Sequence, residues 1–229
     1  MPIGVVSGLR RETECLVTSG METPDVLTFA GIGPERSEAG ARQLIAKGVD
    51  ALVSFGLAGG IAPGLQAGTL VLATVVIAED KTFEASDVWR DSLRRLLPAD
   101  IGVSEGPIVG VDKMVLSRGT KRQLHERTGA IACDMETHAL ARVATETGVP
   151  FVVVRAISDP AWQGVPKGIL SCLTSEGEVD YWGLTLALVR RPWALPALMV
   201  LAGNSKKAFV SLRRVAGTAG SSLGFTSGF

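Results

Sequence analysis

The sequence predicts an α/β protein: a three-layer α/β/α sandwich with a mixed, largely parallel central sheet. Short apolar runs that are typical of strands alternate along the 229 residues with segments whose apolar positions recur at helical spacing. Several runs are apolar at nearly every position, as in Phe151 to Val154, which indicates strands covered on both faces. Ligands of such folds bind beyond the carboxyl ends of the strands, so we expect the functional site there.

The first half of the chain shows four predicted strands and one clearly bounded helix. Apolar runs predict the strands at Ile3 to Val6, Val26 to Ala30, Ala51 to Phe55 and residues 69–79. The third strand is expected to end in the glycine-rich run GLAGG, residues 56–60. After the second strand, Gly33 stands where a helix would be capped, Pro34 takes its first position and Gly48 ends it.

The second half continues the alternation of strands and helices. Residues 80–100 are polar, with a short helical piece around Trp89 to Leu97. The following segments predict a strand at 106–116, a helix at 120–129, a strand end feeding a helix at 131–148, and a last buried strand at 151–159. Gly148 is expected to end the helix before that last strand.

One domain is expected over residues 1–215, because this length fits a single large core. Its part from 160 to 215 diverges in character and consists of apolar, basic helices. A short helix is predicted at Leu184 to Arg191, and after Pro192 a helical stripe follows, formed by Leu195, Leu198, Met199, Ala202, Phe209 and Leu212. Residues 216–229 are rich in glycine and serine and are expected to form a disordered tail.

Composition and charge exclude several classes of function. Lys plus Arg and Asp plus Glu number 23 each, which argues against a nucleic-acid binder. Despite this overall balance, the charges are unevenly distributed: the chain has six basic and no acidic residues from Tyr181 onward. Three scattered cysteines and two histidines predict neither a disulfide framework nor a metal site. No secretory signal and no apolar run of ~20 residues is visible, so a cytoplasmic protein is expected.

Three carboxylates at predicted strand ends are the first candidates for chemistry. They are Glu12 after the first strand, Glu136 before a helix, and Asp159 after the last strand. Each also has a structural interpretation: Glu12 as a solvated residue, Glu136 as a residue that favours a helix N-terminus, and Asp159 as the cap of a turn before Pro160. Their convergence on one edge of the sheet favours a shared site.

Two glycine-rich segments are weaker candidates. The GIG at 31–33 resembles a dinucleotide fingerprint, but Arg36 takes the third glycine position, and a tight strand-to-helix turn explains it at least as well. In GLAGG, the backbone N–H groups around Ala58 and Gly59 are candidates to hold a sugar or an anion, with the same structural alternative.

Motifs along residues 1–160 together resemble a known family. In order and spacing they are similar to those of methylthioadenosine/S-adenosylhomocysteine nucleosidases, within the wider purine nucleoside phosphorylase superfamily. The motifs are MPIGVVSGLRRETE, SFGLAGGIAPGLQAGTLVL, CDMETHALARVA and FVVVRAISD. As a whole, the chain is most similar to the hopanoid-associated phosphorylase-like branch, to which the release of adenine from adenosylhopane is attributed.

The resemblance implies four catalytic residues. Asp159 matches the acid that protonates adenine N7, and Ser158 the serine that orients it. Glu12 matches the carboxylate that activates the attacking water, and Arg155 the arginine close to it. This chemistry needs these residue types, because the ribose gains positive charge while the base departs as an anion. An acid is then required at the base and carboxylates at the sugar.

The resemblance also implies the groups that bind the substrate. Met135 and Glu136 match the pair that holds the ribose hydroxyls. Met114 and Val115 fall where the family stacks an aromatic ring on adenine and binds the base edge through backbone. Here Met114 replaces the aromatic residue, which leaves stacking to a thioether. No cofactor and no metal is implied.

The nucleophile is open between water and phosphate. Leu57 stands where the family has a serine in its GSAGG loop, so a hydroxyl that would contact phosphate is missing. This favours water, although four arginines stay candidate phosphate ligands: Arg10, Arg11, Arg36 and Arg118. The remaining alternatives are a methylthioadenosine/S-adenosylhomocysteine nucleosidase and a non-catalytic nucleoside-binding protein.

The expected partners follow from two further departures. The segment after Glu79 is shorter than the family's loop that closes the 5′ pocket across a dimer, so a bulky apolar 5′ group is predicted. The C-terminal stripe, with Trp182, Trp193 and the basic residues, is predicted to dock on the inner membrane face. The alternative is an ordinary packing helix with a solvated basic edge. The resemblance implies a homodimer.

Overall fold

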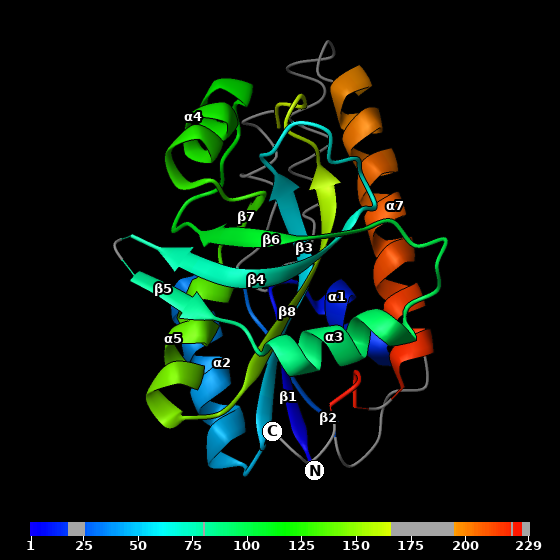
Figure 1. Ribbon diagram of the computed structural model, residues 1–229. Helices are drawn as coiled ribbons and strands as arrows, with labels where there is room; N and C mark the ends of the chain where they lie inside the picture. Colours follow the sequence, from blue (N-terminus) through cyan, green and yellow to red (C-terminus); the bar gives the residue numbers. More distant parts are fainter. Residues whose placement is uncertain (18–25, 80, 166–194, 221, 226–229) are drawn as a thin grey trace.

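The structure, a computed structural model, describes residues 1–17, 26–79, 81–165, 195–220 and 222–225. Its centre is an eight-stranded mixed sheet with helices on both faces (Figure 1). The predicted fold class is therefore confirmed.

The sheet is built from strands of three to ten residues. They are β1 (Ile3–Ser7), β2 (Val26–Ala30), β3 (Ala51–Gly60), β4 (Leu70–Ala78), β5 (Lys81–Glu84), β6 (Val103–Gly110), β7 (Ala132–Asp134) and β8 (Phe151–Asp159). Five strand pairs are parallel: β1 with β2 and β3, β3 with β8, and β6 with β4 and β7. The other three pairs are antiparallel.

The middle of the sheet closes on itself. β8 pairs with both β3 and β4, β4 pairs with β6, β6 with β7, and the short β7 returns to the end of β3. These five strands thus pair in a closed circuit, which brings the ends of β3, β7 and β8 together. Ala58, Gly59, Met135, Glu136, Ser158 and Asp159 lie at or just after these ends.

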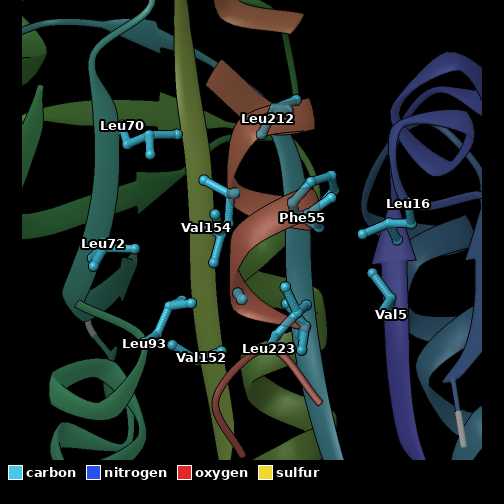
Figure 2. Packing of buried hydrophobic residues seen from close by; sticks show 14 of the residues in the cluster. Val5, Leu16, Phe55, Leu70, Leu72, Leu93, Val152, Val154, Leu212 and Leu223 are labelled. Carbon is cyan, nitrogen blue, oxygen red and sulfur yellow. The ribbon is translucent and has the colours of Figure 1, made fainter. Parts of the chain in front are cut away.

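Helices on the two faces of the sheet cover two separate apolar cores. One core contains residues of α1 (Arg10–Val17), α3 (Asp87–Leu96) and α7 (Leu195–Ala219), packed on β1, β3, β4 and β8. Figure 2 shows Leu16, Leu93 and Leu212 from these helices against Phe55 and Val154. The second core lies under α2 (Pro34–Ala46) and α5 (Thr137–Thr147). α4 (Arg118–Thr128) belongs to a small third cluster.

β8 shows why its sequence is apolar at every early position. Val152 and Val154 face the first core, whereas Phe151 and Val153 face the second. Side chains of a strand alternate between faces, so a strand covered on both faces has no solvated position.

Local signals set several helix ends as the sequence predicts. Pro34 takes the first turn of α2 after Gly33, which has a positive φ of 89°. The side chain of Ser117 accepts a hydrogen bond from Thr120 N at the start of α4. Gly148 ends α5 in the left-handed conformation, with φ 72°.

Three elements differ from the sequence prediction. β3 continues through GLAGG to Gly60, because Gly56 to Gly59 pair with the end of β8. β5 forms an antiparallel pair with β4 inside the polar segment that follows it. β6 ends at Gly110, so residues 111–116 are not strand. The predicted helix at 184–191 lies outside the described residues.

The predicted tail boundary at residue 215 falls inside a helix. α7 continues to Ala219, and Leu223 and Phe225 are buried in the first core. Trp89 on α3 donates its indole N–H to the carbonyl of Leu223 at 2.8 Å, and its ring lies 4.8 Å from that of Phe225. The apolar residues Leu223 and Phe225, which lie among glycines and serines, therefore pack residues 222–225 against the first core.

The predicted apolar stripe of α7 is only partly buried. Leu212 is buried, but Leu195 and Met199 are exposed, and the buried face is formed by Asn204, Ala208, Leu212, Val215, Ala216 and Ala219. Small residues dominate this face because the helix packs directly on β8. Among the helices that the structure describes, none is long and apolar enough to cross a membrane.

Candidate active site

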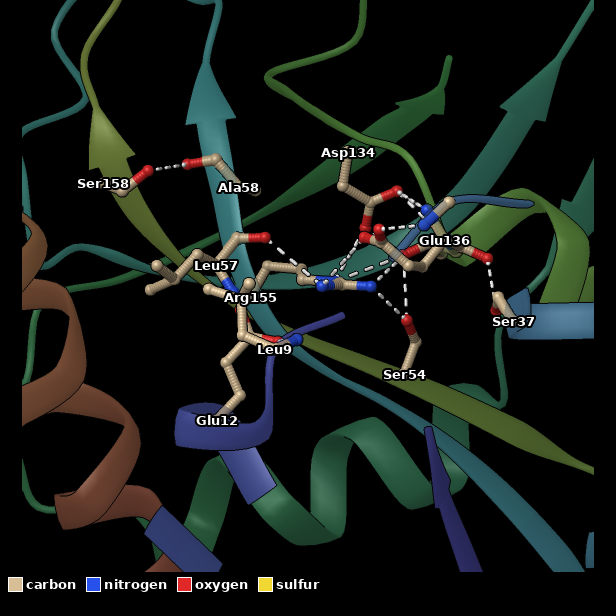
Figure 3. A network of polar contacts seen from close by, with 12 residues as sticks. Leu9, Glu12, Ser37, Ser54, Leu57, Ala58, Asp134, Glu136, Arg155 and Ser158 are labelled. Atoms are coloured by element: carbon tan, nitrogen blue, oxygen red, sulfur yellow. Dashed lines mark hydrogen bonds and ion pairs between the residues drawn. The ribbon is translucent and has the colours of Figure 1, made fainter. Parts of the chain in front are cut away.

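Arg155 on β8 is fully buried at the centre of a polar network (Figure 3). Its Nε lies 2.7 Å from Asp134 Oδ2, and Nη2 donates to Ser54 Oγ at 2.7 Å. Nη1 donates to the carbonyl of Leu57 at 3.2 Å. A guanidinium holds its N–H donors in a rigid fork, so these contacts fix its plane.

Asp134 is a residue of this network that the sequence reasoning missed. Its Oδ1 accepts from the backbone N–H of Thr137 at 3.0 Å and of Glu136 at 3.3 Å, while Oδ2 pairs with Arg155. The Thr137 hydroxyl also donates to Asp134 Oδ2. Asp134 thus caps α5 and aligns Arg155. Its place in the CDMET motif, at the end of a short strand before a helix, is the signal that was available.

Glu136 begins α5, but its side chain does not cap the helix. Its Oε1 accepts from Gly33 N at 2.9 Å, its carbonyl accepts from Ser37 Oγ at 2.9 Å, and Oε2 lies 3.7 Å from Arg155 Nη1. Burial raises the pKa of this carboxyl from 4.5 to about 7, against the opposing effect of Arg155. Glu136 thus stands at a helix N-terminus as predicted, but its side chain contacts Gly33 and Arg155 instead of capping α5.

Glu12 is buried in the first turn of α1. Its Oε2 accepts from Leu9 N at 2.8 Å, which is one half of a capping box, and Oε1 accepts from Leu57 N at 2.7 Å. Burial raises the pKa of Glu12, while Arg155 and the backbone donors oppose that rise. The interpretation of Glu12 as a solvated residue is thus excluded.

Gly56 lets Glu12 and Arg155 approach each other across β3. A Cβ atom at Gly56 would lie 2.6 Å from the Glu12 carboxyl carbon and 2.7 Å from Arg155 Nη1. No side chain fits there. Glycine is therefore required at Gly56 of the GLAGG run, because any larger residue at this place in β3 would clash with the two charged side chains.

Ser158 and Asp159 lie at an irregularity where β3 and β8 change register. Ile157 pairs with Ala58 and Asp159 with Gly59, so Ser158 is the extra residue of a bulge. Its hydroxyl donates to Asp159 Oδ1 at 2.7 Å and lies 3.3 Å from the Ala58 carbonyl. The bulge thus places the Ser158 hydroxyl against the carboxyl group of Asp159.

Asp159 has a second partner, Lys121, that the sequence reasoning missed. Lys121 Nζ lies 2.6 Å from Asp159 Oδ2 and also contacts the carbonyls of Asp159 and Pro160. From the sequence, a lysine within the polar stretch TKRQLHERTG is expected to be exposed to solvent. The signal for its burial is its spacing of three residues from Leu124, the other buried residue of α4.

The remaining predicted residues lie around this site. Met135 is half-buried between Asp134 and Glu136. Met114 and Val115 follow β6 in the segment before α4, where Met114 is 37% exposed and Val115 packs on the third cluster. Their proposed roles in binding the base stay predictions.

The site has two ends along one strand. Three carboxylates surround Arg155. Ser158 and Asp159 follow three and four residues further on, at ~10–13 Å along the strand. This arrangement can hold a sugar at one end and protonate a leaving group at the other. The described residues contain no group of three or more His, Cys, Asp or Glu that could hold a metal ion.

Known proteins with related sequences include nucleosidases. A futalosine hydrolase of Streptomyces coelicolor is 30% identical over 156 residues, which cover 58% of this chain and 66% of that protein. A 5′-methylthioadenosine/S-adenosylhomocysteine nucleosidase of Shewanella sediminis is 28% identical over 218 residues, covering 77% and 94%.

Solved structures show the same fold. The nucleosidase of Neisseria meningitidis in complex with methylthio-immucillin-A matches with a TM-score of 0.73 at 19% identity, covering 96% of this chain and 99% of that one. The futalosine hydrolase of Helicobacter pylori matches with a TM-score of 0.68 at 19% identity, covering 94% and 97%.

The family model described as the phosphorylase superfamily matches residues 6–169. This range contains every predicted site residue from Glu12 to Asp159 and the whole network around Arg155. The chain therefore belongs to the phosphorylase superfamily.

Proposed function

We propose that this protein is an N-glycosyl hydrolase that releases adenine from a 5′-substituted adenosine, with water as the nucleophile. The observation that carries the proposal is the separation of two acidic groups along β8: Asp159 at one end, Glu12 and Glu136 around Arg155 at the other. Superfamily membership and the nucleosidases among the relatives support an enzyme of this class.

The proposed mechanism assigns one step to each end. At the base end, Asp159 protonates N7 so that adenine leaves as a neutral molecule, and Ser158 fixes the carboxyl group. At the sugar end, Glu136 accepts hydrogen bonds from the ribose hydroxyls. Glu12 takes a proton from water as it attacks C1′, and the positive charge of the ribose is stabilised by nearby carboxylates.

The electrostatics of the sugar end favour water over phosphate. Arg155 is already paired with Asp134 and lies beside Glu136 and Glu12, so its charge is compensated. Leu57 offers no hydroxyl, and both of its backbone groups are engaged, by Glu12 and by Arg155. A phosphate ion here would meet carboxylates without a free cation among these residues.

For the substrate we propose adenosylhopane, which would yield ribosylhopane in hopanoid biosynthesis. The support is the short connection after β4: β4 ends at Ala78 and β5 begins at Lys81, which leaves little chain to close over a 5′ group. The named relatives favour methylthioadenosine or S-adenosylhomocysteine as the alternative substrates.

A substrate panel tests this function. Adenine release is measured from adenosines with a 5′ methylthio, homocysteinyl or bulky apolar group, the last presented in detergent or vesicles. We expect the highest kcat/KM with the bulky group. Faster turnover of methylthioadenosine would favour the alternative, and no release from any of them would favour a nucleoside-binding protein.

We further propose that α7 docks the protein on an anionic membrane surface where such a lipid substrate resides. Leu195, Met199 and Val210 share the exposed face of α7 with Lys206 and Lys207. Trp182 and Trp193, predicted to take part, lie outside the described residues.

Co-sedimentation with phosphatidylglycerol vesicles tests the docking. The Leu195→Gln/Met199→Gln protein should pellet less than the wild type, whereas Val88→Gln, at an exposed site on α3, should pellet equally. Equal pelleting of all three would contradict docking. Deletion of α7 is unsuitable, because Leu212 and Val215 belong to the first core.

The homodimer implied by the resemblance is proposed as well. Light scattering should give twice the 24.0 kDa of the chain. A monomer at all concentrations assayed would contradict it.

A further inference from the structure

The side chain of Lys121 is fully buried although it belongs to α4, a polar and largely exposed helix. Its exposed fraction is 0%, against 13% for its partner Asp159. Lysine is almost never fully buried unless it is paired, because removing an ammonium from water is costly. Its burial beside the proposed acid therefore needs a specific reason.

The contacts of Lys121 account for all three of its N–H bonds. Nζ donates to Asp159 Oδ2 at 2.6 Å, to the Asp159 carbonyl at 2.7 Å and to the Pro160 carbonyl at 3.1 Å. An ammonium has three donors and no acceptor, so the pocket matches the charged form of the amine.

Both oxygens of Asp159 face a donor group. Oδ1 lies 2.7 Å from Ser158 Oγ, and Oδ2 accepts from Lys121 Nζ at 2.6 Å. This arrangement suits an acceptor at each oxygen and places the ammonium of Lys121 where it can pass a proton to Oδ2.

We propose that Lys121 and Asp159 form one proton-donating unit, in which Lys121 supplies through Asp159 the proton that the departing adenine takes up. This inference rests on the proposed function. As the bond from C1′ to N9 breaks and its electron pair moves into the base, a proton passes from Nζ to Oδ2 and from the carboxyl group to N7. Asp159 ends as a carboxylate and Lys121 as a neutral amine, which water reprotonates after the products leave.

The other ionisable groups around the pair do not offer this proton. Cys133 on β7 lies close by, since a Cβ atom at Gly59 would be 3.2 Å from Asp159 Oδ2 and 3.5 Å from Cys133 Sγ. Burial raises the pKa of the Cys133 thiol to about 12, so it stays neutral. Asp134 on β7 pairs with Arg155, and His125 Nδ1 on α4 contacts the Ala130 carbonyl.

The competing explanation is that Lys121 only ties α4 to the end of β8. The two roles differ in how the Lys121→Met variant depends on pH. Without the ammonium, Asp159 must take its proton from solvent. Solvent supplies protons more readily at low pH than at high pH, so the variant should lose less activity at low pH.

The test is the ratio of wild-type to Lys121→Met kcat for adenine release, measured at pH 5 and pH 8.5. Glu12 and Glu136 titrate in both proteins, so their effects largely cancel in the ratio. We expect a ratio below ~10 at pH 5 and of ~10² or more at pH 8.5, the size of a general-acid contribution. The same ratio at both values, or no loss in the variant, would overturn the proposal.

A double-mutant comparison gives a second, independent readout. If the two residues act as one unit, Lys121→Met should lower kcat by less than ~3-fold in a protein that already carries Asp159→Asn. Additive losses would contradict the unit. Lys47→Met, at an exposed position after α2, serves as the matched control and should match the wild type.

Thermal unfolding of each variant excludes loss of fold as the cause, and Lys121→Gln replaces Lys121→Met if the latter unfolds. Adenine release by the wild type is measured first. If it is absent, the proposed function fails. If it is present and the ratio does not change with pH, only the role of Lys121 fails.

Discussion

Arg155 shows how one side chain organises a site that the sequence gives only as separate motifs. Its guanidinium contacts residues of β3, β7 and α5, and Glu12 approaches it from α1. Three carboxylates share this single guanidinium, and burial outweighs its attraction at Glu12 and Glu136. Both carboxyls therefore have raised pKa values, as is common for groups at functional sites.

At the same scale, Asp159→Asn should lower turnover strongly. An amide keeps the shape of the side chain and its contact with Ser158 but cannot protonate N7, so we expect kcat to fall by ~10²–10⁴-fold. Steady-state kinetics of adenine release measure this. Asp50→Asn, an exposed position at the start of β3, is the control and should leave kcat unchanged. Near-normal turnover in Asp159→Asn would remove Asp159 from the mechanism.

Glu136 should make stability depend on pH. The folded protein keeps this proton up to about pH 7, whereas the unfolded chain releases it near 4.5. The folded state therefore binds more protons in this window, and the free energy of unfolding falls as pH rises through it. Glu136→Gln cannot ionise, so relative to wild type it should gain up to ~3 kcal/mol between pH 4.5 and pH 8.

Urea unfolding at these two pH values measures that difference. Glu126→Gln, whose side chain is 65% exposed, provides the control and should show no comparable change. A difference between wild type and Glu136→Gln that is constant with pH would show that this carboxyl ionises normally in the folded protein.

At the scale of elements, the C-terminal segment after α7 is a structural part of the first core. Phe225 is buried against Trp89, so Phe225→Ala should lower the free energy of unfolding by about 3 kcal/mol. Urea denaturation measures the loss. Val210→Ala, on the exposed face of α7, should change it by less than ~0.5 kcal/mol. Equal stability of both variants and the wild type would mean that this segment does not pack.

The same elements show what the sequence could and could not predict. Apolar periodicity and glycine or proline signals located seven of the eight strands and the helices α2 to α5, because burial and backbone geometry leave local traces. β5 was not predicted, because its residues are largely exposed and pair only with β4. The packing of the segment around Leu223 and Phe225 was not predicted either, because two apolar residues are too few to produce a periodic pattern.

Some of the site residues could likewise be predicted from the sequence, and others could not. Glu12, Glu136, Ser158, Asp159 and Arg155 were predicted because the motifs that carry them are local in sequence. Lys121 and Asp134 were not, since their importance comes from pairing with residues of β8 that lie 38 and 21 positions away. The bulge that places Ser158 opposite no residue of β3 is likewise visible only in the strand register.

At the scale of the whole molecule, the closed circuit of five strands explains why one edge carries the chemistry. β3, β7 and β8 end together, and α1, α4 and α5 each bring one charged residue to that place: Glu12, Lys121 and Glu136. The fold thus brings Asp159 and the carboxylates around Arg155 together from segments spread over about 150 residues of the chain.

Water as the nucleophile distinguishes the proposed hydrolase from a phosphorylase with the same fold. Adenine release from the preferred 5′-substituted adenosine should therefore be measured in phosphate-free buffer and again with saturating phosphate. We expect equal rates and a free ribosyl product in both buffers. Release only with phosphate, with a sugar 1-phosphate as product, would show that phosphate is the nucleophile.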